Sequence, residues 1–472
     1  MNQQCTSLKE HIKRAIVTPI LKKGGTDPSD PEKSRPITGL SFPAKIMEKV
    51  VCGQLQLFME EGNLFDKWQS GFRPKHGTET ALLDVMDHLL VDADRGAHSI
   101  LILLDLSAAF DTVNHQILLT RLQEVARVSD QALKWFKSFL EEREYRVKLG
   151  DFYSEPIKVT CGVPQGSPLS PLLFNIYLRP LLAVIASLGL RFQSYADDTQ
   201  LFSRISTNEP EAEAKLVAGL EIIKNWMAAN YLQLNQAKTE VLRSGNIPEG
   251  HWVLSWPDGA GVCPRTADTV GTLGVLIDSD LTLIPYVGQV VKTCHFKMRL
   301  LYRILPFLSD LERISVVRAL VLPHLDYCNG LLAGLPQVQI RRLQKVQNQA
   351  VRLALNLRGH CPTARHQAAL HWLPVGQRVR FKILTLVFKA FHGLGPAYLC
   401  EKLNRHVTGR SLRWSCQFRL EQPKSRLKKW GGRAFSVLGP REWNLLPLSL
   451  RQSPDLPTFR RDLKTYLWAE AD

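Results

Sequence analysis

Long apolar runs are missing from this sequence. No stretch approaches the ~20 residues that a bilayer span needs, since the apolar residues 181–190 are too few. Residues 1–10 lack the apolar core of a signal peptide. The nine cysteines are scattered without a pairing pattern, as expected for reduced thiols. These absences predict an intracellular protein of the nucleus, the cytoplasm or both, which is not secreted and has no membrane partner.

Acidic residues are scarce in the second half of the chain. Residues 281–472 hold 31 Lys+Arg against 10 Asp+Glu, a net charge of +21. Residues 1–280 carry a net charge of −5. So uneven a distribution predicts a polyanion held mainly by the second half, and nucleic acid fits better than a membrane surface because no amphipathic anchor is evident.

The most basic segment, residues 341–433, has 20 Lys+Arg and only Glu401 and Glu421 as acids. Three tryptophans interleave with these charges: Trp372, Trp414 and Trp430. Cations beside aromatic rings neutralise phosphates and stack bases. The candidate nucleic-acid contacts are Arg341, Arg342, Lys345, Arg352, Lys428 and Lys429. A helix with one solvated basic side is the alternative interpretation.

Several familiar sites are also missing. The sequence has no Gly-rich phosphate loop, no Ser-His-Asp pattern and no recognisable set of ribonuclease H carboxylates. Four residues of types that bind metals lie near one another in the sequence, but their spacing fits no common zinc module. They are His360, Cys361, His366 and His371.

What is present is organised around Tyr195-Ala196-Asp197-Asp198. Strand-like aromatic and apolar runs flank this turn on both sides. Asp favours tight turns and is poor in strand interiors, so the pattern predicts a hairpin with both acids at its tip. Taken alone, the two acids fit solvated turn residues equally well.

A third carboxylate follows the apolar run from Ser99 to Leu104, which is typical of a buried strand. Asp105 ends that run, where a carboxylate is costly unless it serves a cation or a hydrogen-bond donor. If this strand neighbours the hairpin, Asp105, Asp197 and Asp198 converge. Three such acids repel one another unless divalent cations neutralise them, and two Mg²⁺ ions, with Mn²⁺ as a substitute, are the recurring device for phosphoryl transfer.

The remaining pattern predicts alternating strands and helices up to about residue 285 and helices beyond it. An amphipathic helix is expected from Glu211 to Tyr231, and one strand is expected from Thr272 to Ile277.

Sequence motifs occur in the order and spacing of a known family. The central ones are Leu104-Asp105-Leu106-Ser107-Ala108-Ala109-Phe110-Asp111, Gly162-Val163-Pro164-Gln165-Gly166-Ser167, Tyr195-Ala196-Asp197-Asp198 and Leu234-Asn235-Gln236-Ala237-Lys238-Thr239-Glu240. Front pieces are Lys22-Lys23, Arg35-Pro36-Ile37 and Gln69-Ser70-Gly71-Phe72-Arg73, and tail pieces are Leu325-Asp326-Tyr327-Cys328-Asn329, His371-Trp372-Leu373-Pro374-Val375 and Arg433-Ala434-Phe435-Ser436. Together they resemble reverse transcriptases of non-LTR (LINE-type) retrotransposons, near the jockey-like branch.

The resemblance implies an α+β right-hand polymerase with a helical basic C-terminal extension. Its expected parts are fingers at 1–98, a palm with an antiparallel sheet at 99–285, a helical thumb at 286–360 and the extension at 361–472. The endonuclease that precedes the fingers in such elements is expected to be missing from this chain.

The resemblance also implies roles for individual residues. Asp105, Asp197 and Asp198 would be catalytic metal ligands together with the Leu106 carbonyl. Contacts to the incoming nucleotide would come from Lys22, Lys23, Arg35, Phe110, Gln165, Gly166 and Lys238. Phe110 would exclude a ribose 2′-hydroxyl, while Tyr195 and Ala196 would support the primer end.

The implied function is an RNA-directed DNA polymerase that extends a DNA primer on an RNA template with dNTPs. Two alternatives remain open. One is a catalytically silent, nucleic-acid-binding remnant of such an enzyme, and the other is a reverse transcriptase of the intron-maturase type. The oligomeric state is not predicted.

Overall fold

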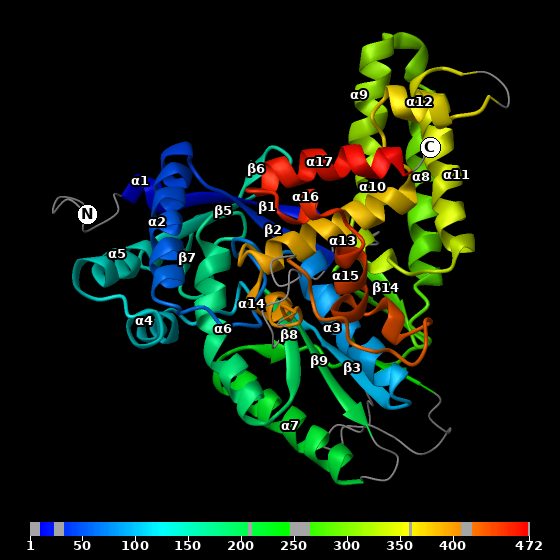
Figure 1. The fold of residues 1–472 in the computed structure, drawn as a ribbon. Coiled ribbons are helices and arrows are strands. Elements are labelled where there is room, and N and C mark those ends of the chain that lie inside the picture. The colour runs from blue at the N-terminus through cyan, green and yellow to red at the C-terminus, as the bar shows by residue number, and fades with distance from the viewer. Residues whose placement is uncertain are drawn as a thin grey trace.

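The structure is a computed structural model that describes residues 10–22, 33–205, 210–245, 265–357, 361–406 and 418–470. Lys23, His360 and Trp414 lie outside these residues. The ribbon is drawn in Figure 1.

A five-stranded sheet lies at the centre, with the strand order β12-β11-β3-β9-β8. Its strands are β3 (His98–Leu104), β8 (Arg191–Tyr195), β9 (Asp198–Ile205), β11 (Glu240–Ser244) and β12 (Arg265–Thr266). All pairs are antiparallel except β11 with β12. The predicted antiparallel sheet is thereby confirmed. Strand β3 lies between β9, which begins at Asp198, and β11, which begins at Glu240.

Both faces of this sheet are covered, which explains the unbroken apolar run of β3. Ile100, Ile102 and Leu104 pack into one core with helices α6 (Ser170–Ser187) and α7 (Pro210–Ala229). Leu101 points into a second core that includes α3 (Thr78–Asp94) and the C-terminal helices. Alternate residues of one strand therefore hold two different parts of the chain.

A second sheet has the order β2-β1-β5-β6, with β7 also paired to β5. Its strands are β1 (Arg14–Leu21), β2 (Ser34–Gly39), β5 (Arg143–Leu149), β6 (Phe152–Tyr153) and β7 (Ile157–Val159). The helices in this part of the sequence are α1 (Glu10–Lys13), α2 (Phe42–Glu61), α4 (His115–Glu124) and α5 (Asp130–Leu140).

Two short antiparallel pairs complete the strands. β4 (Leu106–Ser107) pairs with β10 (Gln233–Leu234), and β13 (Thr269–Thr272) pairs with β14 (Val275–Asp278). The single strand predicted over 272–277 is therefore wrong. Leu273 and Gly274 both have positive φ (46° and 79°), as in a two-residue hairpin turn, so the chain reverses there.

From residue 284 to 469 the described chain is helical, as predicted. The elements are α8 (Ile284–Tyr302), η2 (Leu305–Phe307), α9 (Asp310–Leu320), α10 (Leu322–Asp326), η3 (Asn329–Leu332), α11 (Gln337–Ala354), α12 (Ala364–Ala369), α13 (Val375–Phe391), α14 (Ala397–Cys400), η4 (Gly431–Arg433), α15 (Phe435–Asn444), α16 (Leu448–Arg451) and α17 (Leu456–Ala469). In Figure 1, α8, α9 and α11 stand upright on one side, and α17 lies above α13 in this view.

Helix α7 ends two residues before the predicted end. Leu216, Leu220, Ile223 and Met227 are buried on one face, as the periodicity indicated. Tyr231 does not share that face: it lies beyond the helix with φ 55° and is 62% exposed. A left-handed residue cannot continue an α-helix, so the chain turns there into β10.

Of the described helices, α6 alone is long and apolar enough to cross a membrane by length and composition. Helix α6 is a core helix in this fold, since 61% of it is buried inside the protein. The fold is α+β, as predicted, and the boundaries at residues 98, 285 and 360 remain predictions.

Candidate active site

The predicted hairpin forms and brings its acids to Asp105. Tyr195 pairs with Asp198, leaving Ala196 and Asp197 at the tip. Ala196 has φ 58°, as the first central residue of a type II′ turn requires. Leu104 pairs with Thr199, so the next residue, Asp105, lies beside Asp198. We call residues 195–198 the catalytic hairpin.

Each of the three carboxylates is electrostatically strained. Burial, followed by the charges of Asp197 and Asp105, raises the pKa of Asp198 to about 6. Burial and Asp105 raise the pKa of Asp197, and burial raises the pKa of Asp105. A neighbouring carboxylate disfavours the ionised form of a carboxyl group and so raises its pKa.

Basic residues lie near enough to oppose the charge of these acids. The charge of Arg35 opposes the rise in the pKa of Asp197 and Asp198. The charges of Lys238 and Lys22 oppose the rise in the pKa of Asp105. In each case burial is the larger effect. Arg35, Lys22 and Lys238 are exposed and come from β2, the residue after β1, and the turn before β11. The structure therefore brings residues from three separated motifs around one acidic centre.

The donor types fit a divalent cation, because three carboxylate oxygens repel one another until a cation is present. Among the residues that the structure describes, however, no three His, Cys, Asp or Glu side chains are already gathered as a metal cage. Leu106 lies in β4, opposite Leu234. These residues therefore have the chemistry to bind a metal, and the coordinating distances are not preformed.

Gln69 fixes the catalytic hairpin from behind. Its Oε1 accepts hydrogen bonds from the backbone N–H of Ala196 (3.1 Å) and of Gly71 (2.7 Å), and its Nε2 donates to Ser194 Oγ (3.1 Å). A Cβ on Gly71 would overlap the amide nitrogen of Ala196 and lie 3.0 Å from the Tyr195 carbonyl carbon. Only glycine permits this approach, which explains the Gln-Ser-Gly order physically.

A second layer behind Gln69 comes from the far end of the chain. Ser70 Oγ lies 2.8 Å from Tyr398 Oη, which donates to Thr80 Oγ1 (3.0 Å). The Tyr398 ring stacks on Trp68 at a centroid distance of 5.8 Å. Burial raises the pKa of Tyr398 to about 12, so the hydroxyl stays a hydrogen-bond donor. Sequence patterns gave no signal for this contact, because 328 residues separate its two ends.

Phe110 and Gln165 are held next to the site by different contacts. Phe110 is half-buried and stacks on Phe174 at 4.8 Å. Gln165 Nε2 donates to both oxygens of Asp111 (2.9 and 2.8 Å), and its backbone oxygen accepts from Thr38 N (2.7 Å). Asp111 therefore orients Gln165, a role that sequence reasoning missed although both residues lie in quoted motifs.

The turn around Gly166 has its own support. Gly166 is exposed with φ 113°, and a Cβ there would lie 3.1 Å from the Thr38 oxygen. The next residue, Ser167, donates its hydroxyl to buried Glu48 of α2. Glu48 also lies 3.5 Å from Arg143 Nη2 of β5. This buried group ties the turn to the second sheet, and no sequence signal singled it out.

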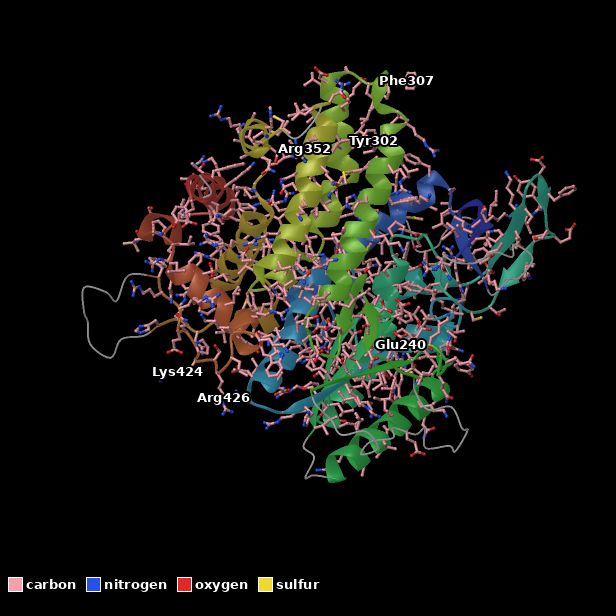
Figure 2. The ribbon with its side chains drawn as sticks, turned by 90° about the vertical axis from the view of Figure 1, so that its right-hand side faces the viewer. Glu240, Tyr302, Phe307, Arg352, Lys424 and Arg426 are labelled. Carbon is pink, nitrogen blue, oxygen red and sulfur yellow. The ribbon has the colours of Figure 1, made fainter. Side chains whose placement is uncertain are left out.

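The basic candidates of the second half are spread over two surfaces. On α11, Arg341 and Lys345 are exposed, while Arg342 donates to Gln339 (2.8 Å) and Arg352 donates to the Cys361 oxygen (3.2 Å). Figure 2 shows Arg352 on the upright helices, far from Lys424 and Arg426 at the opposite edge. Lys428 and Lys429, near that edge, are exposed. Lys429 Nζ lies 4.9 Å from the centre of the Trp430 ring.

The proposed base-stacking role of the tryptophans is corrected in one case. Trp372 is 4% exposed and belongs to the core that contains α3. Trp430 is half-buried against the same core. An indole ring buries a large apolar area when it packs in a core. Because the Trp372 ring is buried there, it is not available to stack on a base. His366 Nε2 lies 3.7 Å from Cys361 Sγ, and these two belong to no metal group among the described residues.

An antiparallel sheet that carries three converging carboxylates beside a glycine-rich turn and opposing basic residues defines a class, the palm-type nucleotidyl-transferring polymerases. Residues 20–277, more than half of the chain, match the family model described as "Reverse transcriptase (RNA-dependent DNA polymerase)". The chain belongs to this family.

Two of the curated relatives are named for mobile elements of Drosophila. The chain is 27% identical over 361 residues to "Probable RNA-directed DNA polymerase from transposon BS" of Drosophila melanogaster, covering 75% of this chain and 39% of that protein. It is 24% identical over 422 residues to "RNA-directed DNA polymerase from mobile element jockey" of Drosophila funebris, covering 87% of this chain and 44% of that protein. The chain thus spans about two fifths of their length, and the predicted jockey-like resemblance is confirmed.

Among solved structures, apo telomerase from Candida tropicalis aligns with a TM-score of 0.44 at 12% identity, covering 79% of this chain and 63% of that chain. Telomerase from Candida albicans in complex with a fragment of telomeric RNA aligns with a TM-score of 0.42 at 12% identity, covering 79% and 62%.

Proposed function

We propose that this chain is an RNA-directed DNA polymerase of a non-LTR retrotransposon, which extends a DNA 3′-hydroxyl on an RNA template. The observation that carries the proposal is the meeting of Asp105, Asp197 and Asp198 at one end of the central sheet. There Asp105 contributes to the raised pKa of Asp197, and both contribute to the raised pKa of Asp198, although burial is the larger effect. Such an enzyme works inside the cell, in the nucleus, the cytoplasm or both.

The metal ligands in this proposal are the carboxylates of Asp105, Asp197 and Asp198 and the carbonyl of Leu106. When bound, two Mg²⁺ ions, or Mn²⁺ in their place, activate the attacking hydroxyl and neutralise the charge of the leaving pyrophosphate. The protein contributes the alignment. Gln69 and Gly71 hold the catalytic hairpin rigidly against the sheet, and small displacements of reacting groups are costly in rate.

The incoming dNTP would lie between the carboxylates and the second sheet. Lys22, Arg35 and Lys238 supply positive charge there for a triphosphate, with Lys23 adjacent in sequence. Phe110, fixed by its stacking on Phe174, would limit the space at the sugar. Gln165 and the backbone of Gly166 would contact the nucleotide from the other side, with Asp111 orienting Gln165.

The nucleic-acid strands would extend from this point towards the basic half of the chain. Tyr195 and Ala196 of the catalytic hairpin would support the primer end. Additional phosphate contacts would come from exposed cations on α11 and near η4: Arg341, Arg342, Lys345, Arg352, Lys428 and Lys429.

Primer extension tests the proposal directly. The purified chain should extend a DNA primer on an RNA template with dNTPs and Mg²⁺, and Asp197→Ala should abolish the product. Asp151→Ala is the matched control, because Asp151 is an exposed acid on another hairpin turn. If the chain binds primer–template but yields no Mg²⁺-dependent product, the silent-remnant alternative replaces the proposal.

A further inference from the structure

Three adjoining cavities run along α13 and α17, away from the catalytic carboxylates. Their volumes are about 670, 450 and 340 Å³. All three are lined by Phe381 and Arg460, the first two share Lys382, and the first and third share Lys464. The shared lining residues show that the three cavities adjoin one another, and we treat them as one surface region. We call it the α13–α17 groove, with the defining residues Arg318, Phe381, Lys382, Lys389, Arg460 and Lys464.

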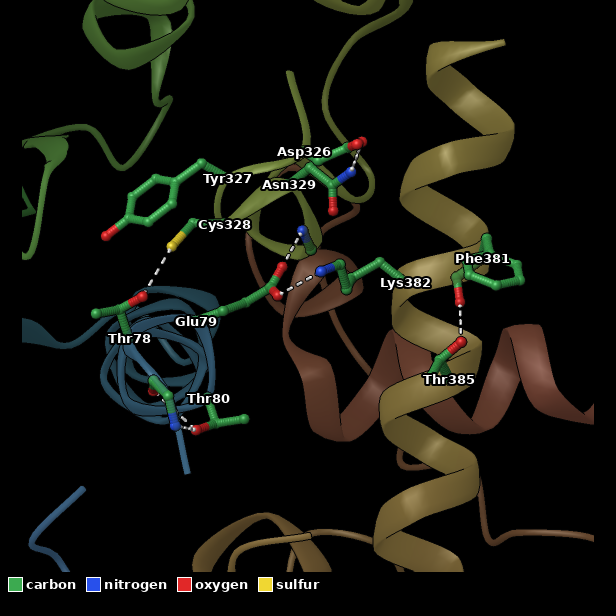
Figure 3. A network of polar contacts seen from close by, with 12 residues as sticks. Thr78, Glu79, Thr80, Asp326, Tyr327, Cys328, Asn329, Phe381, Lys382 and Thr385 are labelled. Atoms are coloured by element: carbon green, nitrogen blue, oxygen red, sulfur yellow. Dashed lines mark hydrogen bonds and ion pairs between the residues drawn. The ribbon is translucent and has the colours of Figure 1, made fainter. Parts of the chain in front are cut away.

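The groove has an excess of positive charge. Two carboxylates line it, Asp326 and Glu79. Asp326 is bound by both Arg378 Nε (2.8 Å) and Arg378 Nη2, and Glu79 pairs with Lys382 Nζ at 3.2 Å. Figure 3 shows the Glu79–Lys382 pair bridging α3 and α13. Both acids are therefore neutralised from within the protein.

The other four cations of the groove have no such partner. Within the described part of the chain, no carboxylate lies within ion-pair distance of Arg318, Lys389, Arg460 or Lys464. Burial and then Arg460 and Lys382 lower the pKa of Lys389. Burial and then Arg318 and Arg378 lower the pKa of Lys464. The groove thus holds cations that repel one another and that a polyanion would stabilise.

An aromatic ring lies at the centre of the charged wall. Phe381 is half-buried, lines all three cavities, and has the Arg460 guanidinium 5.8 Å from its ring centre. Proteins that bind single-stranded nucleic acid combine a basic groove for the backbone with aromatic rings for the bases. An acidic peptide would use the cations but would have no use for the ring.

The groove begins close to the back of the active site. Its second cavity is lined by Lys75, His76 and Gly77, and Gly71, which packs against the catalytic hairpin, is four residues before Lys75. Four residues span at most about 14 Å. The Cα atoms of Gly71 and Lys75 are therefore at most about 14 Å apart.

We propose that the α13–α17 groove binds a single-stranded polynucleotide, with phosphates against its cations and a base on Phe381. This site is separate from the catalytic carboxylates and from the basic residues of α11. It rests on the proposed function only for the origin of the strand, since the chemistry of the groove fits single-stranded RNA and single-stranded DNA alike.

Lysine footprinting of the full chain tests the site. The protein is acetylated with an amine-reactive reagent with and without an unpaired oligonucleotide, and modification is read by mass spectrometry. Lys389 and Lys464 should be protected at least about threefold, whereas exposed Lys134 and Lys215, on α5 and α7, should be unchanged. Equal labelling of Lys389 and Lys464 in both samples overturns the proposal. Equal protection by polyglutamate at the same charge concentration also overturns it.

Matched charge variants test the energetics. Arg460→Gln with Lys464→Gln should weaken oligonucleotide binding about tenfold at low salt and flatten the salt dependence by about 1.4 in the log–log slope, the value for two phosphate contacts on a single strand. Lys134→Gln with Lys215→Gln removes the same charge and should change neither quantity. Phe381→Leu keeps the packing and should weaken binding without altering the slope. Variants that bind like the wild type overturn the proposal.

The same assay identifies whether the groove binds RNA or DNA, and it tests the groove proposal separately from the polymerase proposal. Tighter protection by RNA than by DNA assigns the groove to RNA, the reverse assigns it to DNA, and equal protection assigns it to backbone contacts alone; all three support the groove. Asp197→Ala should keep the footprint at Lys389 and Lys464 while losing primer extension. A wild-type protein that shows the footprint but no extension contradicts the polymerase proposal and leaves the groove intact.

Discussion

Two groups of carboxylates in the first 200 residues differ in what surrounds them. Three acids of α3 accept hydrogen bonds from the second half of the chain. Glu79 accepts from Gly330 N (2.8 Å), Asp87 from Ser436 N (2.8 Å), and Asp94 from the N–H groups of Arg426 and Leu427 (2.8 and 2.7 Å). Asp105, Asp197 and Asp198 instead lie close enough together that Asp105 contributes to the raised pKa of Asp197, and both contribute to that of Asp198.

Lysine placement strengthens the contrast. Lys402 Nζ lies 3.0 Å from buried Asp84 and 2.9 Å from Asp87. At the catalytic hairpin, burial and then the charges of Asp197 and Asp105 raise the pKa of Asp198 to about 6. The difference teaches that partners, and not burial alone, separate a structural carboxylate from one held ready for a cation.

Substituting one acid of each group should separate the loss of activity from the loss of stability. Asp105→Asn should lower primer extension by about a thousandfold, because losing several kcal/mol of charge stabilisation costs tenfold per 1.36 kcal/mol. Its melting temperature should not fall below that of the wild type, because burial raises the pKa of Asp105 in the folded protein. Asp87→Asn should show the opposite pattern, with a clearly lower melting temperature. Equal effects on both quantities in both variants would remove the distinction.

Removing the shared lysine should expose the dependence of α3 on its partner. Lys402→Met leaves Asp84 and Asp87 without their cation and should lower the free energy of unfolding by about 3–5 kcal/mol, as breaking a buried ion pair does. Lys424→Met is the control, because Lys424 is exposed at the edge seen in Figure 2. Chemical denaturation measures both, and equal midpoints would contradict the role of Lys402.

Glycine substitution should test the support of the catalytic hairpin. Gly71→Ala should cost about 1–3 kcal/mol of stability through overpacking and should lower activity about a hundredfold, because the hairpin must move. Gly53→Ala should be neutral or slightly stabilising, since nothing lies within 4 Å of a Cβ at that helical position. Wild-type activity for Gly71→Ala would show that the hairpin is not fixed from this side.

The smallest expected effect is a pH-dependent gain in stability. The pKa of Asp198 is raised in the folded protein, so its ionisation destabilises the fold as pH rises from about 4 through 6 and fully above 6. In a chelator, Asp198→Asn should therefore melt about 1–3 °C above the wild type at pH 7.5. No difference is expected at pH 4. A gain that is the same at both pH values would point to another cause.

The sequence was sufficient where chemistry and short-range pattern coincide. The run ending at Asp105 and the alternation around residues 195–198 predicted their strands, and the acids followed from the strand ends. It failed where φ or packing at single residues decided the outcome. Leu273 and Gly274 turned one predicted strand into a hairpin, and Trp372 was drawn into the core.

Long-range supports could not be predicted at all. Tyr398 and Lys402 have no local pattern that indicates α3, and Gln69 is one polar residue among many until its hydrogen bonds to the hairpin are known. Such contacts depend on how sheet and helices meet in three dimensions. The acids of α3 carried no motif, although four buried carboxylates on one apolar helix are themselves unusual.

The distance in sequence between Asp87 and Ser436 has a consequence for synthesis. The donor lies 349 residues after its acceptor, and at 5–20 residues per second a ribosome needs roughly 20–70 s to reach it. Throughout that interval α3 carries charged groups on the face that will become a core. The hydrogen bond between Asp87 and Ser436 can therefore form only after residue 436 has been synthesised.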